Sequence, residues 1–298
     1  MFQKILNKLK SKNQKNTQET PNKRALLMKK FFEDGKIPWS PGYEFYKRDA
    51  IVESISNKTL LESIQSNKLP EGFGHRLDER VVEYAWLFSN MPENNVKMLD
   101  AGSTFNFPYL VEHPIIENKE LTIYTYAPEE ESFNKNRISY VYGDLRELFF
   151  KDNYFDLIIS QSTIEHIDMD NSMYGYDLDF NKEVEIKSYE YLKAVSEMLR
   201  VLKPGGTLML TVPFGKFENH GFFQQFDKEM INRIYDLLKS EGTIESTFFT
   251  YQKEGWRFAL IDELSTIESY NPHTGKGKKD DGAAHSRAIA CIKFIKNR

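Results

Sequence analysis

From residue 96 onward, short apolar runs alternate with longer stretches of helical spacing. Apolar runs of this length are typical of strands buried on both faces of a parallel sheet, with helices as the connections. The alternation therefore predicts one doubly wound α/β domain over residues 96–298. The expected strands are 96–99, 121–124, 138–142, 155–160, 207–212, 246–251 and 288–294, and the main expected helices are 183–202 and 227–240.

The residues before this domain lack the alternation. Residues 25–95 have apolar positions at helical spacing and predict a helical N-terminal extension. Its expected helices are 25–32, 50–65 and 77–90. The last of these has acids near its start, where they favour a helix N-terminus. We therefore expect three helices in front of the sheet.

Residues 1–24 form a separate, basic lead. Nine of the 40 Lys and Arg residues fall within residues 1–30, together with only one of the 44 acids. Phe2, Ile5 and Leu9 recur on one helical face, a pattern found in helices that lie on anionic membrane surfaces. A weak, reversible membrane contact is one interpretation of this lead. A solvated tail, or a helix packed against its own domain or a partner, is the other.

The composition narrows the class of protein. No apolar run approaches the roughly 20 residues of a membrane-spanning helix, and the first residues lack the apolar core of a secretory signal. Outside the basic lead the chain is strongly acidic, which argues against a general nucleic-acid binder. The single cysteine, Cys291, excludes an intrachain disulfide and fits a reducing compartment. We expect a soluble cytoplasmic protein without a nucleic-acid partner.

Polar residues and glycines gather where several expected strands end. Open α/β sheets bind their ligands outside the carboxyl ends of the strands, so these positions are candidates for a site. Each segment taken alone also fits an ordinary turn or helix cap. The segments are LDAGS (99–103), YGDL (142–145) and FDLIISQSTIEH (155–166), and a fourth segment, LKPGG (202–206), leads into a strand.

In this order and spacing, the four segments resemble the class I S-adenosylmethionine-dependent methyltransferases. The resemblance covers about residues 96–215 and is strongest to members that act on small molecules, sugars or glycan precursors. It implies a seven-stranded, Rossmann-like sheet whose last strand is antiparallel and inserted near the edge. It also implies S-adenosylmethionine as cofactor and a small-molecule or sugar acceptor.

The resemblance further implies which residues contact the cofactor. Residues 100–103 would border its methionine part, residues 144–145 its adenine, and residues 160–162 its sulfonium. Two departures from the family pattern stand out: the first motif keeps a single glycine, and Thr125 stands where an acid usually binds the ribose hydroxyls. The implied contacts are Asp100, Ala101, Gly102, Ser103, Thr125, Tyr126, Asp144, Leu145, Ser160, Gln161 and Ser162.

Methylation of a hydroxyl also requires that its proton leave, and a base assists this step. His166, just beyond the fourth expected strand, is the first candidate, and Glu165 is placed to orient it or to bind acceptor hydroxyls. His220, beyond the fifth strand, is the second candidate. A divalent metal held by this loop is an alternative, although a polar loop without metal is the favoured interpretation.

Two other functions stay open at this point. The thinned glycine motif favours a methyltransferase-like domain that has lost catalysis and serves as a binding or scaffold subunit. A dinucleotide or nucleotide-sugar oxidoreductase is a third possibility, but the three-glycine fingerprint expected for it is absent.

Overall fold

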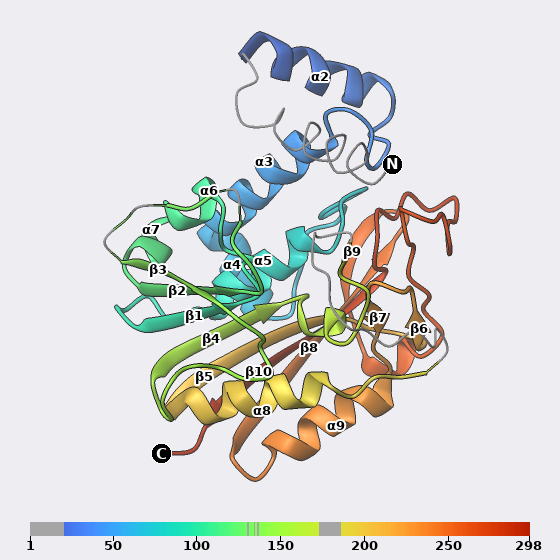
Figure 1. The fold of residues 1–298 in the computed structure, drawn as a ribbon. Helices are drawn as coiled ribbons and strands as arrows, with labels where there is room; N and C mark the ends of the chain where they lie inside the picture. The colour runs from blue at the N-terminus through green and yellow to red at the C-terminus, as the bar shows by residue number, and fades with distance from the viewer. Residues whose placement is uncertain (1–20, 130, 134, 136, 173–185) are drawn as a thin grey trace.

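The computed structural model describes residues 21–129, 131–133, 135, 137–172 and 186–298. Its centre is an eight-stranded sheet with the order β3-β2-β1-β4-β5-β10-β8-β9 (Figure 1). The strands are β1 Lys97–Ala101, β2 Glu120–Thr125, β3 Ile138–Tyr142, β4 Phe155–Gln161, β5 Leu202–Pro213, β8 Gly242–Gln252, β9 Gly255–Ala259 and β10 Ala288–Lys296. Strands β1 to β5 run parallel, and β10 lies antiparallel between β5 and β8. The predicted doubly wound sheet with an inserted antiparallel last strand is therefore confirmed.

The eighth strand was not expected from the sequence. β9 pairs antiparallel with β8 across a tight turn and forms the outer edge of the sheet. The turn reverses at Gly255, whose φ is +134° and whose added Cβ would lie 2.5 Å from the carbonyl oxygen of Phe73. Only glycine tolerates this backbone conformation and this close approach. The edge hairpin is thus fastened to the segment that precedes α5.

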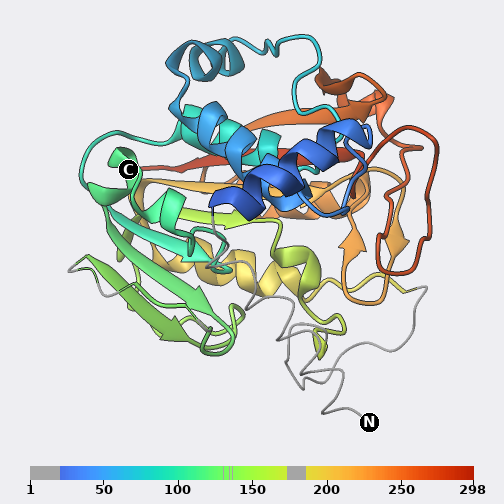
Figure 2. The same ribbon diagram turned by 90° about the horizontal axis from the view of Figure 1, so that it is seen from above.

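Helices cover both faces of the sheet, as Figures 1 and 2 show. The expected helix 50–65 is two helices, because the side chain of Asn57 accepts a hydrogen bond from the backbone of Leu60 and caps a new start. The helices and shorter elements are α2 Pro21–Glu33, α3 Tyr43–Ser56, α4 Lys58–Gln65, α5 Arg80–Asn90, α6 Pro108–Val111, α7 Pro114–Glu117, η1 Ile164–His166, α8 Tyr191–Val201, β6 Glu218–Asn219, β7 Gln224–Gln225, α9 Lys228–Leu238 and η3 Ile261–Glu263.

Alternate residues of each central strand enter different cores. In β4, Leu157 and Ile159 pack in the core that includes α3, α4 and α5, whereas Ile158 packs in the core that includes α8 and α9. Side chains of a strand alternate between its faces, so a strand buried on both faces must be apolar throughout. This arrangement explains why LIIS (157–160) is an unbroken apolar run that ends in a serine.

Two of the expected helices lie partly outside the residues that the structure describes. The amphipathic helix expected within residues 1–24 lies almost wholly outside the described residues. Of the helix expected over 183–202, residues 183–185 also lie outside them, but residues 186–190 are described and are not helical, so this expectation was wrong at its start and the helix begins at Tyr191. Within the described part of the chain, no helix combines the length and apolar character needed to cross a bilayer.

Candidate active site

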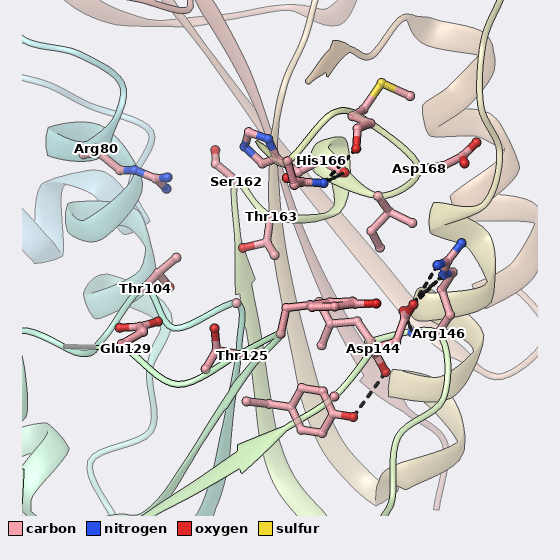
Figure 3. A pocket seen from close by; sticks show the side chains of 18 residues that line it. Arg80, Thr104, Thr125, Glu129, Asp144, Arg146, Ser162, Thr163, His166 and Asp168 are labelled. Atoms are coloured by element: carbon pink, nitrogen blue, oxygen red, sulfur yellow. Dashed lines mark hydrogen bonds and ion pairs between the residues drawn. The ribbon is translucent and has the colours of Figure 1, made fainter. Parts of the chain in front are cut away.

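A pocket with a volume of about 280 Å³ lies at the carboxyl ends of β1, β2, β3 and β4 (Figure 3). The chain proceeds outward from β1 to β3 and then returns to the other side with β4, so β1 and β4 flank the point where the strand order reverses. This switch point is where open α/β sheets bind ligands. Residues from the end of each of these four strands line the pocket, as does Arg80 from α5.

About half of the predicted site residues line this pocket. Those that line the pocket are Gly102, Thr125, Tyr126, Asp144, Leu145, Ser162 and His166. The predicted residues that do not line it are Asp100, Ala101, Ser103, Ser160, Gln161, Glu165 and His220. Most of the second set are buried directly behind the first, at the strand ends and within the core.

The loop after β1 is organised by Asp100. Its carboxylate accepts hydrogen bonds from the backbone of Thr104, at 3.1 Å, and of Phe105, at 2.8 Å, and burial raises its pKa to about 7. Gly102 has a φ of +131°, and an added Cβ would lie 2.1 Å from the hydroxyl of Thr163. The remaining glycine of this motif is therefore required for packing between the β1 and β4 loops, and its replacement would disturb the loops as well as any ligand.

At the end of β3, Asp144 is paired with Arg146. The guanidinium of Arg146 lies 2.6 Å from the Asp144 carboxylate, and its own backbone N–H donates to the same group. Burial alone would raise the pKa of Asp144, but the hydrogen bonds and charge of Arg146 outweigh it and hold the pKa below its usual value. The pocket thus has a fixed carboxylate at this end, together with an arginine that the sequence did not single out.

Beyond the end of β2, the pocket contains an acid, Glu129, that was not predicted from the sequence. Thr125 is buried and lines the pocket, and Glu129, four residues later, lines it as well. The Glu129 carboxylate accepts a 2.8 Å hydrogen bond from the side-chain amide of Asn106, whose oxygen accepts from Tyr140 at 2.9 Å. Asn106 stands where a further glycine of the first motif was expected, and here it holds Glu129.

His166, in η1 after β4, has a hydrogen bond that defines its tautomer. Its Nδ1 lies 2.6 Å from the carbonyl oxygen of Phe222, which can only accept, so the proton is on Nδ1 and the lone pair on Nε2. Burial lowers the pKa of His166 to about 4; the Phe222 hydrogen bond opposes this shift and the charge of Arg80 adds to it. The imidazole is therefore neutral at physiological pH.

The other two candidate catalytic residues lie behind the pocket. Burial raises the pKa of Glu165 well above its usual value, and its Oε1 lies 4.0 Å from Nε2 of His166. The second oxygen of Glu165 is buried and has no hydrogen-bond partner among the described residues. His220 is buried with its Nε2 2.9 Å from the hydroxyl of Ser269 and its ring stacked 4.5 Å from that of Phe223.

The loop that carries His166 was the alternative metal site expected from the sequence. Over the described residues, no group of three or more His, Cys, Asp and Glu side chains is arranged to hold a metal ion. Asp168 lies in the same loop, and its carboxylate accepts a 2.7 Å hydrogen bond from Ser188. Asp168 is therefore engaged with a neighbouring side chain of the protein.

A sequence comparison matches residues 119–210 to a family described as a methyltransferase domain. No curated protein sequence matches the chain. A Burkholderia thailandensis 1,6-didemethyltoxoflavin-N1-methyltransferase, solved with S-adenosylhomocysteine, is 11% identical over 94% of this chain and 92% of that one, with a TM-score of 0.42. A Methanosarcina mazei S-adenosylmethionine-dependent methyltransferase is 12% identical over 72% and 98%, with a TM-score of 0.40. A Bradyrhizobium japonicum N-methyltransferase, solved with S-adenosylhomocysteine, is 12% identical over 68% and 80%, with a TM-score of 0.35.

Proposed function

We propose, from the premise that this chain is a class I S-adenosylmethionine-dependent methyltransferase, that it methylates a hydroxyl of a small polar acceptor such as a sugar or glycan precursor. The observation that carries the proposal is the His166 imidazole on the pocket wall, with its proton fixed on Nδ1 by Phe222. An imidazole in this tautomer offers the Nε2 lone pair to an acidic proton. The expected cytoplasmic location fits a chain whose single cysteine is buried in the core.

The residues around the pocket fit the parts of the cofactor. We assign Asp144 and Leu145 to the adenine, and Glu129 to the ribose hydroxyls, because an ionised carboxylate accepts hydrogen bonds strongly. We assign Arg80 to the carboxylate of the methionine part, since its guanidinium is the cation nearest the β1 loop on this wall. When bound, the cofactor supplies an electrophilic methyl group on a sulfonium.

The chain's own residues have two tasks in this reaction. The strand-end loops align the acceptor with the transfer point and exclude water, which is the larger part of catalysis for a reactive methyl donor. His166 then receives the acceptor's proton on Nε2, and Glu165 is the positioning residue behind it. The proposed division of the chain into residues 1–24, 25–95 and 96–298 makes the middle segment part of the active unit, because α5 delivers Arg80.

Two experiments test this function. The first is calorimetry with S-adenosylhomocysteine, and the second is a methyl-transfer screen of sugars and nucleotide sugars with labelled cofactor. We expect saturable one-to-one binding and transfer to a hydroxyl. Binding without transfer to any acceptor class would instead support the inactive scaffold. A folded protein that does not bind the product would exclude the cofactor assignment.

The pH dependence of turnover is a separate prediction. A base works only when it is unprotonated, so activity should be lost as the pH falls through the pKa of His166. Since that pKa is about 4, protonation of His166 should not lower the rate between pH 8 and about 5.5, where an ordinary histidine with a pKa near 6.5 would already be protonated. An NMR titration of the His166 ring would separate this from the titration of Asp100, whose pKa is about 7, and a His166 midpoint near pH 6.5 would contradict the assigned protonation state.

A further inference from the structure

Glu83, in the first turn of α5, is completely buried and is surrounded by hydrogen-bond donors. Its Oε1 accepts from the hydroxyl of Ser162 and, at 2.6 Å, from that of Thr211. Its Oε2 accepts from the side-chain amide of Gln161 at 3.3 Å and from the guanidinium of Arg80 at 3.2 Å. A carboxylate removed from water is stable only with such partners, so the donors and the acid hold one another in place.

These partners come from three elements that meet beneath the pocket. Arg80 lies on α5, Ser162 follows β4, and Thr211 lies in β5. Ser162 has a φ of +40°, a backbone conformation that residues other than glycine rarely adopt. Its backbone N–H is fixed by Thr211 and its hydroxyl by Glu83. The turn that leads to His166 is therefore held by the Glu83 network.

The same carboxylate restrains Arg80. One guanidinium nitrogen of Arg80 donates both to Glu83 and to the carbonyl oxygen of Gln161, each at 3.2 Å. Figure 3 shows the guanidinium directed from α5 into the pocket, beside Ser162. A single buried acid thus contacts both the cation and the strained turn, and these two lie next to each other because Arg80 also donates to Gln161.

We propose that Glu83 is a positioning residue that holds the Arg80 guanidinium and the Ser162 turn side by side at the edge of the pocket, and thereby determines how both meet the cofactor. This inference rests on the proposed function, because it assigns Glu83 a role in the same site. Glu83 does not line the pocket, so its effect on a ligand must pass through the residues that it holds.

The test compares Glu83→Gln in two backgrounds by calorimetry with S-adenosylhomocysteine. In the otherwise unchanged chain, glutamine turns one acceptor oxygen into a donor that faces other donors, and we expect affinity to fall by about tenfold. In an Arg80→Ala background, the same change should weaken affinity by less than about threefold, because one of the two groups that Glu83 orients is gone and only the Ser162 turn is left for it to hold. An equal loss in both backgrounds, or unchanged affinity in folded Glu83→Gln, would overturn the proposal.

Two further variants separate positioning from a general loss of stability. Asp156→Asn removes the charge of an acid that pairs with Lys203 at 2.6 Å at the opposite end of β4, and it should leave affinity unchanged. If Glu83→Gln does not fold, Thr211→Val removes one donor to Glu83 and one acceptor of the Ser162 N–H, and so loosens the same network. It should weaken binding a few-fold, and unchanged affinity would refute the role of Glu83. If the unaltered protein does not bind the product, the proposed function itself fails, whereas binding that is insensitive to these changes refutes only the positioning role.

Discussion

Replacement of His166 by alanine is expected to lower turnover by about 100- to 10,000-fold, the range typical of a lost general base. Affinity for S-adenosylhomocysteine should change by less than about threefold, because the imidazole acts on the acceptor's proton and not on the cofactor. The physical basis is the Nδ1 hydrogen bond to Phe222, which leaves the lone pair on Nε2, on a ring that lines the pocket. Steady-state rates with saturating cofactor, combined with calorimetry, measure the two quantities separately.

A neighbouring histidine provides the matched control. The ring of His273 meets that of Phe222 edge-on at 5.5 Å, but His273 does not line the pocket. His273→Ala therefore removes another contact of the Phe222 ring without removing the proposed base. Its turnover should stay within about threefold of the unaltered enzyme. Retention of activity in His166→Ala would show that the base lies elsewhere, and His220→Ala would then be the next variant to measure.

The central strands were predictable because burial on both faces of the sheet requires an apolar residue at nearly every position. Central strands such as β4 are buried on both faces and must be continuous apolar runs. The edge strand β9, by contrast, has the sequence GWRFA, which mixes polar with apolar residues because this outer strand is only partly buried. The break of the expected helix 50–65 depends on one side-chain cap at Asn57, which an apolar periodicity does not reveal.

The site was predictable only where strand ends determine it. Gly102, Asp144 and Ser162 directly follow β1, β3 and β4 or lie close to their ends, so parallel topology alone brings them together. Arg80 reaches the pocket from a helix before the sheet, and its approach depends on how α5 packs. Glu165 adjoins His166 in the chain, and only the structure shows that a turn of 3-10 helix buries it behind the pocket wall.

Glu129 leads to the second large prediction, because it changes how the chain's departure from the family pattern is understood. In the resemblance, Thr125 stands where the family usually has an acid. In the structure, Glu129 lines the same pocket, and Asn106 holds its carboxylate at 2.8 Å. We infer that Glu129, four residues along the chain from Thr125, can supply the carboxylate that the strand end lacks.

Glu129→Gln should therefore weaken S-adenosylhomocysteine binding by about ten- to a hundredfold, the effect of removing hydrogen bonds to an ionised acceptor. Thr125→Val, the matched control, keeps the shape of the side chain at the strand end and should weaken binding by less than about threefold. Since Glu129 is exposed apart from its contact with Asn106, neither variant should alter the thermal midpoint by more than about 2 °C. The assignment of the ribose to Glu129 would be wrong if Thr125→Val lost more affinity than Glu129→Gln in calorimetry. In that case the hydroxyl at the strand end, and not Glu129, binds the ribose.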